Sequence, residues 1–274
     1  MASLETFTNQ LDEDVMLLTI GKTKIKFQET GEGSPLLLIH GLGMSHKLWR
    51  SQIPAFSKFH RTIAVDLRGF GESSKPCAPG SYAVSVLTED LVGLLETLSI
   101  PRAHILGTSM GGFVAQTIAL DYPELCLSTI LCHTSSRMNI PPDILKERLD
   151  MLASSSLEEY AKLVVDQAFG PNADVSLKSW ISEMVSSNDK NAYSQVLSEG
   201  LSDFDLSSRV SKISVPTLVV VGEHDRVIPP DQGRDLASKI RNAKLEEIPG
   251  VGHLGYSEEP DIFNQIVLKF LSAL

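Results

Sequence analysis

At residues 107–111 the chain reads Gly-Thr-Ser-Met-Gly, between an apolar run at 103–106 and a helical run at 113–120. This is a Gly-x-Ser-x-Gly segment on a strand-to-helix turn, where an exposed serine can act as a nucleophile. So sharp a turn pushes Ser109 toward a strained backbone conformation, and glycines two residues away avoid collisions with the neighbouring strand and helix. Three fixed positions recur by chance in about one chain in ten of this length. The rest of the chain therefore has to support the motif.

Short apolar runs alternate with helical stretches, a pattern typical of a mostly parallel sheet flanked by helices. The runs 36–39 and 218–221 are continuously apolar, as strands covered on both faces are. Only Gly21 and Lys22 separate the first two strands, which predicts an antiparallel hairpin. The expected strands are 15–20, 23–28, 35–40, 62–66, 103–108, 128–133, 216–222 and 244–248. The expected helices of the same part of the chain are 46–58, 84–98, 111–121, 232–240 and 260–271.

This alternation stops between His133 and Pro216. Four consecutive helices are expected there, at 141–152, 157–169, 175–187 and 191–201. We therefore expect an α/β core made of residues 1–134 and 210–274. A helical cap, residues 135–209, would be inserted after the sixth strand and stand over the carboxyl ends of the strands.

The amino-acid composition argues against several classes of partner and site. The 274 residues include 24 Lys+Arg and 34 Asp+Glu, a net charge of −10, which argues against nucleic acid and anionic membranes as partners. No apolar stretch approaches the roughly 20 residues of a membrane span, and residues 1–15 carry no basic residue, unlike a typical secretory signal. The three cysteines are too scattered for a disulfide framework or a zinc site. We expect a cytoplasmic protein.

Five segments, each just after an expected strand, together resemble the α/β-hydrolase superfamily over essentially the whole chain: 40–43, 66–73, 107–112, 222–225 and 250–253. The resemblance implies an eight-stranded, mostly parallel sheet and a catalytic triad in the order Ser, Asp, His. The compact helical insertion, the exit segment 131–137 and Ile228-Pro229-Pro230 look most like the 3-oxoadipate enol-lactone hydrolase and small carboxylesterase branch.

The chemistry of this family assigns the triad residues. Ser109 would be the nucleophile, His253 the base that takes its proton, and Asp225 the acid that orients the imidazole. The backbone N–H groups of Leu42 and Met110 would form the oxyanion hole. We expect His40, Asp66 and Arg68 to shape the loops around the site through hydrogen bonds, and Asp203 or Asp205 is a less favoured alternative acid.

Residue identities narrow the reaction. Haloalkane dehalogenases and epoxide hydrolases of this fold carry aspartate where this chain has Ser109, and carbon–carbon bond hydrolases carry a Ser-x-Gly-Pro-Gly loop that residues 40–44 lack. The resemblance favours a hydrolase of a small carboxylic ester or lactone, without a cofactor, acting as a monomer or homodimer. A receptor-like hydrolase that binds a small lactone and a haloperoxidase-like perhydrolase remain alternatives. The histidines His46, His60, His104 and His133 show no metal-ligand spacing, so no metal site is expected.

The substrate pocket is expected between core and cap. Leu42, Met110, Val227 and Leu254 would form its floor and cap side chains its roof, which favours small substrates. The candidate binding residues are Met44, Arg137, Met138, Trp180, Val227 and Leu254. Packing between cap helices explains the cap residues equally well, and a surface salt bridge would explain Arg137.

Overall fold

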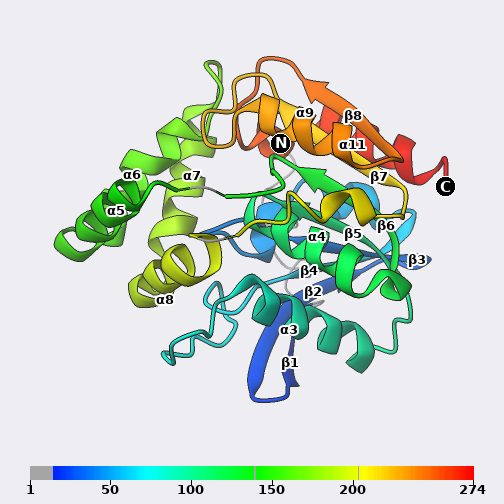
Figure 1. Ribbon diagram of the computed structural model, residues 1–274, viewed down its shortest axis with the longest axis horizontal. Coiled ribbons are helices and arrows are strands. Elements are labelled where there is room, and N and C mark those ends of the chain that lie inside the picture. The colour runs from blue at the N-terminus through cyan, green and yellow to red at the C-terminus, as the bar shows by residue number, and fades with distance from the viewer. Residues whose placement is uncertain (1–14, 139, 203) are drawn as a thin grey trace, which may run out of the picture.

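The computed structural model describes residues 15–138, 140–202 and 204–274, and its centre is an eight-stranded sheet in the order β1-β2-β4-β3-β5-β6-β7-β8 (Figure 1). The first two strands form the expected antiparallel hairpin, β2 also pairs antiparallel with β4, and the remaining pairs are parallel. The strands are β1 (Val15–Ile20), β2 (Thr23–Thr30), β3 (Ser34–Ile39), β4 (His60–Val65), β5 (Ala103–Thr108), β6 (Cys126–Cys132), β7 (Thr217–Gly222) and β8 (Ala243–Ile248). Their ends agree with the expected ones to within two residues.

Helices cover both faces of this sheet, so every residue of β5 and β7 is buried. Helices α3 (Val84–Thr97), α4 (Met110–Asp121) and α9 (Pro230–Lys239) pack along one face, while α2 (Ile53–Phe56) and α11 (Pro260–Leu271) contact each other (Figure 1). The fold class expected from the sequence is confirmed.

The expected helix at 46–58 is wrong. The chain forms a 3₁₀ turn, η1 (His46–Trp49), and then the single turn α2. Pro54 explains the interruption, because proline lacks an N–H and its ring clashes with the carbonyl four residues earlier. Pro54 is therefore placed in the first turn of a new helix.

Between β6 and β7 the described part of the chain forms four α-helices that lie to one side of the sheet (left in Figure 1). It contains α5 (Pro142–Ser154), α6 (Leu157–Gln167), α7 (Val175–Ser186) and α8 (Lys190–Gln195). Side chains cap three of these helices: Ser156 forms a capping box with Glu159, while Asp174 and Asp189 cap α7 and α8. The division into core and cap at residues 135–209 stays a prediction.

The last cap segment differs from expectation. Residues 191–201 were expected to form one α-helix, but α8 changes at Val196 into the π-helical turn η3 (Val196–Leu201). Gly200 in this turn packs so closely on the backbone that a Cβ there would lie 2.6 Å from the carbonyl oxygen of Tyr82. The wider turn lets the cap touch the core at this point.

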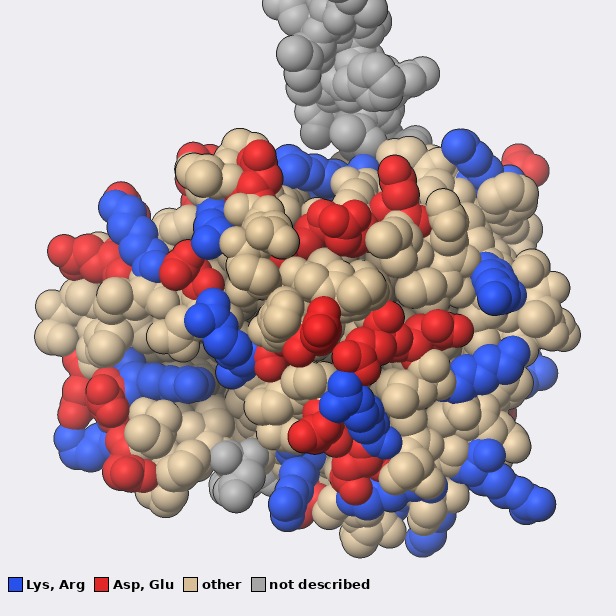
Figure 2. Space-filling model, turned by 90° about the horizontal axis from the view of Figure 1, so that it is seen from above, with Lys and Arg blue, Asp and Glu red and all other residues tan. Residues whose placement is uncertain are grey.

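The face over α9, β8 and α11 carries charges of both signs, with acidic side chains near its middle (Figure 2). Arg234 on α9 pairs with Asp231 at 2.5 Å and with Glu247 of β8 at 2.6 Å. These pairs lie in solvent and contribute little to stability. None of the described helices is long and apolar enough to cross a membrane.

Candidate active site

Ser109 occupies the turn between β5 and α4 with φ 52° and ψ −119°, a left-handed conformation rare for a residue other than glycine. Its N–H donates to the carbonyl oxygen of Cys132 at 2.9 Å, and its carbonyl oxygen accepts from the hydroxyl of Thr134 at 2.9 Å. A Cβ on Gly107 would lie 2.1 Å from the carbonyl oxygen of Gly111, and one on Gly111 would lie 2.3 Å from that of Ile39. The strain expected from the sequence is present, and both flanking glycines are sterically required.

Asp225 and His253 form a buried pair beyond the carboxyl ends of β7 and β8. Nδ1 of His253 lies 2.7 Å from Oδ2 of Asp225, while Oδ1 accepts from the N–H groups of Val227 and Ile228 at 2.9 Å each. Burial acts to raise the pKa of Asp225, but the two neighbouring histidines outweigh it and hold that pKa well below its usual range. An ionised carboxylate facing Nδ1 holds the proton there and leaves Nε2 free to accept another.

Parallel register brings these groups to one edge of the sheet. Thr108, just before Ser109, pairs with Cys132 of β6, which in turn pairs with Val220 of β7. The hydroxyl of Ser109 forms no hydrogen bond with His253 among the described residues. The carboxyl ends of β5, β6 and β7 thus meet at one edge of the sheet, and Asp225 is hydrogen-bonded to His253.

The loop after β3 approaches the serine closely. A Cβ on Gly41 would lie 3.1 Å from Cβ and 3.7 Å from Oγ of Ser109. Buried His40 shapes this loop: its Nε2 accepts from the N–H of Leu67 at 3.0 Å, so its Nδ1 carries the proton and donates to the carbonyl oxygen of Gly41 at 2.7 Å. Burial lowers the pKa of His40 to about 4, so the ring is neutral.

Asp66 and Arg68 support the surrounding loops, as expected. Oδ1 of Asp66 accepts from the backbone N–H and from Nδ1 of His46, at 2.6 and 2.7 Å, and Oδ2 accepts from the N–H of Glu72. Arg68 makes a two-pronged salt bridge with Asp90 at 2.5 and 2.6 Å. Asp66 and Arg68 thus stabilise the turns around the site.

The two residues expected to form the oxyanion hole, Leu42 and Met110, follow Gly41 and Ser109 in the chain. Met110 is the first residue of α4, where backbone N–H groups are free of partners within the helix, and Leu42 is half-buried next to Gly41. Their roles as donors stay a prediction. Asp205 is exposed, and its Oδ1 accepts a hydrogen bond from the backbone N–H of Ser207 at 2.7 Å. Asp203 lies outside the described residues.

The six candidate binding residues do not share one pocket. Arg137, Met138 and Val227 line a cleft of about 650 Å³ between α5 and α9. Trp180 lines a separate cleft of about 320 Å³ beside His46 and Asp66, and the guanidinium of Arg50 lies 3.7 Å from its ring centre. Met138 and Trp180 thus line two different clefts, and their roles in substrate binding stay a prediction. Trp180 lies on helix α7, whereas Met138 precedes α5. Met44 and Leu254 are buried.

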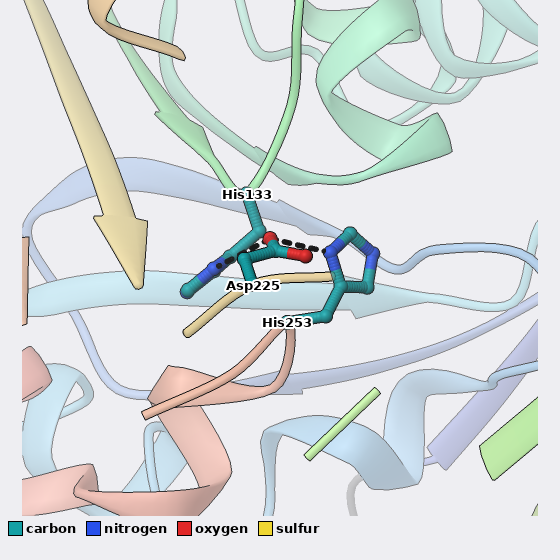
Figure 3. Close-up of side chains that lie close together, drawn as sticks. All are labelled: His133, Asp225 and His253. Atoms are coloured by element: carbon teal, nitrogen blue, oxygen red, sulfur yellow. Dashed lines mark hydrogen bonds and ion pairs between the residues drawn. The ribbon is translucent and has the colours of Figure 1, made fainter. Parts of the chain in front are cut away.

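His133 is the residue that sequence reasoning missed at this site. Its ring is fully buried, its Nδ1 lies 3.5 Å from Oδ2 of Asp225, and its ring centre lies 5.9 Å from that of His253 (Figure 3). Burial lowers the pKa of His133 more than the nearby carboxylate raises it, so the ring is neutral. The available signal was topological: β6 and β7 are neighbours, so residues just past their carboxyl ends meet.

Comparison with known proteins agrees with this architecture. A family model described as alpha/beta hydrolase fold matches residues 34–179 and 169–260. The 3-oxoadipate enol-lactonase 2 of Acinetobacter baylyi is 28% identical over 247 residues, covering 85% of this chain and 86% of the relative.

Two solved structures extend the likeness to three dimensions. The enol-lactonase from Burkholderia xenovorans has a TM-score of 0.87 at 29% identity, covering 94% of this chain and 100% of its own. A thermophilic esterase from Thermogutta terrifontis has a TM-score of 0.86 at 26% identity, covering 94% and 98%. The chain belongs to the α/β-hydrolase family.

Proposed function

We propose that this protein is a serine hydrolase that cleaves a small carboxylic ester or lactone through an acyl-enzyme on Ser109. The observation that carries the proposal is the buried Asp225–His253 hydrogen bond of 2.7 Å, at the same sheet edge as the strained turn of Ser109. An oriented imidazole beside a serine held in this way is the arrangement that nucleophilic acyl transfer requires.

The first half-reaction forms the acyl-enzyme. Nε2 of His253 takes the hydroxyl proton as Oγ of Ser109 attacks the carbonyl carbon, and the ionised Asp225 stabilises the imidazolium. The N–H groups of Leu42 and Met110 donate to the oxyanion. When the tetrahedral intermediate collapses, His253 returns the proton to the departing alkoxide. With an ester the alcohol leaves, whereas with a lactone it stays attached to the acyl group.

The second half-reaction restores the enzyme. Nε2 of His253 takes a proton from water, whose oxygen attacks the acyl carbon, and the second tetrahedral intermediate releases the acid as Ser109 regains its proton. All proton transfers use His253, so the proposed reaction needs no cofactor. Support for the substrate class comes from the relatives, which bear the names enol-lactonase and esterase.

A serine-directed phosphonate tests the nucleophile. It should add once per chain, at Ser109, as shown by peptide mass spectrometry, and Ser109→Ala should remain folded while kcat falls on the order of 10³-fold or more. Nitrophenyl esters and lactones of increasing size then define the substrate. Labelling at another serine, or full activity of Ser109→Ala, would overturn the proposal.

The same assays separate the alternatives. Tight lactone binding with very slow turnover would indicate a receptor-like protein. Peroxide-dependent halogenation exceeding ester hydrolysis would indicate a perhydrolase.

A further inference from the structure

The backbone conformation and the burial of His133 are energetically unfavourable, which points to a function for its ring. Its backbone has φ 47°, in the left-handed region, and its side chain is completely buried. Neither ring nitrogen forms a hydrogen bond with any described residue, and Nδ1 makes only the 3.5 Å contact with Oδ2 of Asp225. A buried polar side chain without a hydrogen bond is uncommon in folded proteins and points to a function or to a bound group. The ring packs edge-on against those of His253 and Tyr256, which fixes its orientation.

Three potential metal ligands converge at this point (Figure 3). Oδ2 of Asp225 lies 2.7 Å from Nδ1 of His253 and 3.5 Å from Nδ1 of His133, and the three ligand atoms all lie within 4.8 Å of one another. Two imidazoles and one carboxylate are a typical zinc set, with bonds of about 2.0–2.1 Å and hence ligand atoms about 3.3 Å apart. Side-chain shifts of about 1 Å would bring the three atoms to that spacing.

We propose that His133, Asp225 and His253 form a binding site for Zn²⁺, and that zinc bound there inhibits the enzyme. The ion would take Nδ1 of His253 and displace the proton that Nδ1 shares with Asp225. The imidazole would then carry its proton on Nε2, where it cannot accept one from Ser109. Zinc binding stands on the geometry alone, whereas inhibition rests on the proposed function.

The surroundings favour a cation. Asp225 stays ionised, and the partly buried carboxyl group of Glu258 accepts from the N–H groups of Gly170 and Gly252 at 2.8 and 2.9 Å. A cleft of about 540 Å³ reaches Asp225 from the surface and is lined by Glu223 and His224, with Arg226 as the opposing charge. Imidazole ligands select zinc over the hard cations Mg²⁺ and Ca²⁺.

Calorimetric titration with ZnCl₂ tests the site directly. The wild-type chain should bind one ion at this site, and His133→Asn, which keeps a polar group but not a good zinc ligand, should bind it at least tenfold more weakly. The matched control is His224→Asn, because His224 is an exposed histidine on the same approach. That variant should bind as the wild type does. Ser109→Ala should also bind normally, which separates this test from the test of the nucleophile.

Activity measurements test the consequence. Zinc should slow hydrolysis of a short nitrophenyl ester, EDTA should restore the rate, and equal Mg²⁺ should have no effect. In His133→Asn, compared with its own zinc-free rate, inhibition should need at least tenfold more zinc. Equal zinc affinity in wild type and His133→Asn, or loss of binding in His224→Asn, would overturn the site. If circular dichroism shows that His133→Asn is unfolded, His133→Gln takes its place. Binding without inhibition would overturn the inhibitory role.

Discussion

The backbone N–H of His253 donates to the carbonyl oxygen of Ala168 at 2.7 Å, so the proposed base is held by the segment that follows cap helix α6. The contact is close because Gly252 has no side chain. A Cβ there would lie 2.5 Å from the carbonyl carbon of Phe169 and 2.6 Å from both the carbonyl oxygen of Ala168 and the amide nitrogen of Gly170. The backbone of residues 252–253 is therefore held against residues 168–170, which follow α6.

Gly252→Ala should displace His253 and lower kcat by about 10²-fold, since misplacing a catalytic group by about 1 Å has this effect. The obstructing atoms are backbone, so they cannot rotate away. The matched control is Gly250→Ala in the same loop, where a Cβ would meet nothing within 4 Å but φ is 75°. It should lose about 1 kcal/mol of stability and keep its kcat. Equal kcat values for the two variants would show that this packing does not position the base.

Asp225→Asn should lower kcat by about 10³-fold or more while KM changes little, because the amide can donate to Nδ1 and leave the imidazole in the wrong tautomer. The asparagine keeps Oδ1 as the acceptor for the N–H groups of Val227 and Ile228. The fold should therefore survive, as a thermal melt would show. Asp205→Asn, an exposed residue of the cap end, serves as the control. A greater loss in Asp205→Asn than in Asp225→Asn would place the acid elsewhere.

Stability should fall on mild acidification because of His40. Burial lowers its pKa in the folded protein to about 4 from 6.5. Above pH 6.5 the ring is neutral in both states; between pH 6.5 and 4 only the unfolded chain binds the proton, so the free energy of unfolding decreases. At 1.36 kcal/mol per pKa unit, His40 alone accounts for about 3 kcal/mol over this window.

Urea unfolding between pH 7 and 4.5 checks this expectation. His40→Gln should be less stable at pH 7 but should show a shallower loss on acidification than the wild type. His104, whose pKa is also lowered to about 4 by burial, contributes in the same window, and His104→Asn gives an independent comparison. If the free energy of unfolding of both variants falls with pH as steeply as that of the wild type, neither ring stays neutral in the folded protein.

The sequence allowed most of the core to be predicted from local patterns, and the family resemblance allowed the pairing of Asp225 with His253 to be predicted. Apolar runs identify β5 and β7, and glycine spacing identifies the turn at Ser109. The position of His133 depends on which strands are neighbours and on their parallel register, and no local pattern contains that information. The placing of Trp180 and Met138 depends on how short amphipathic helices pack, which several arrangements of the cap would satisfy. The break at Pro54 could have been predicted from proline chemistry alone.

Met138 and Trp180 should differ in their effect on substrate size. Met138 lines the cleft of about 650 Å³ together with Val227, whose N–H donates to Asp225, whereas Trp180 lies on the other cleft under Arg50. Met138→Ala should therefore shift kcat/KM toward longer acyl chains or larger alcohols by about 1–3 kcal/mol per fitted group. Trp180→Ala should leave chain-length preference unchanged, although loss of the ring beneath Arg50 should lower stability.

A series of nitrophenyl esters from acetate to octanoate measures both variants, and phosphonate labelling of Ser109 confirms that the nucleophile stays reactive. If Trp180→Ala changes the preference and Met138→Ala does not, the substrate enters beside His46 and Asp66. If the wild type already prefers octanoate, the site is open to long chains, and the proposal of a small ester or lactone as substrate fails. Only a size preference that Met138→Ala relaxes would identify the cleft between α5 and α9 as the place where the acyl or alcohol group is accommodated.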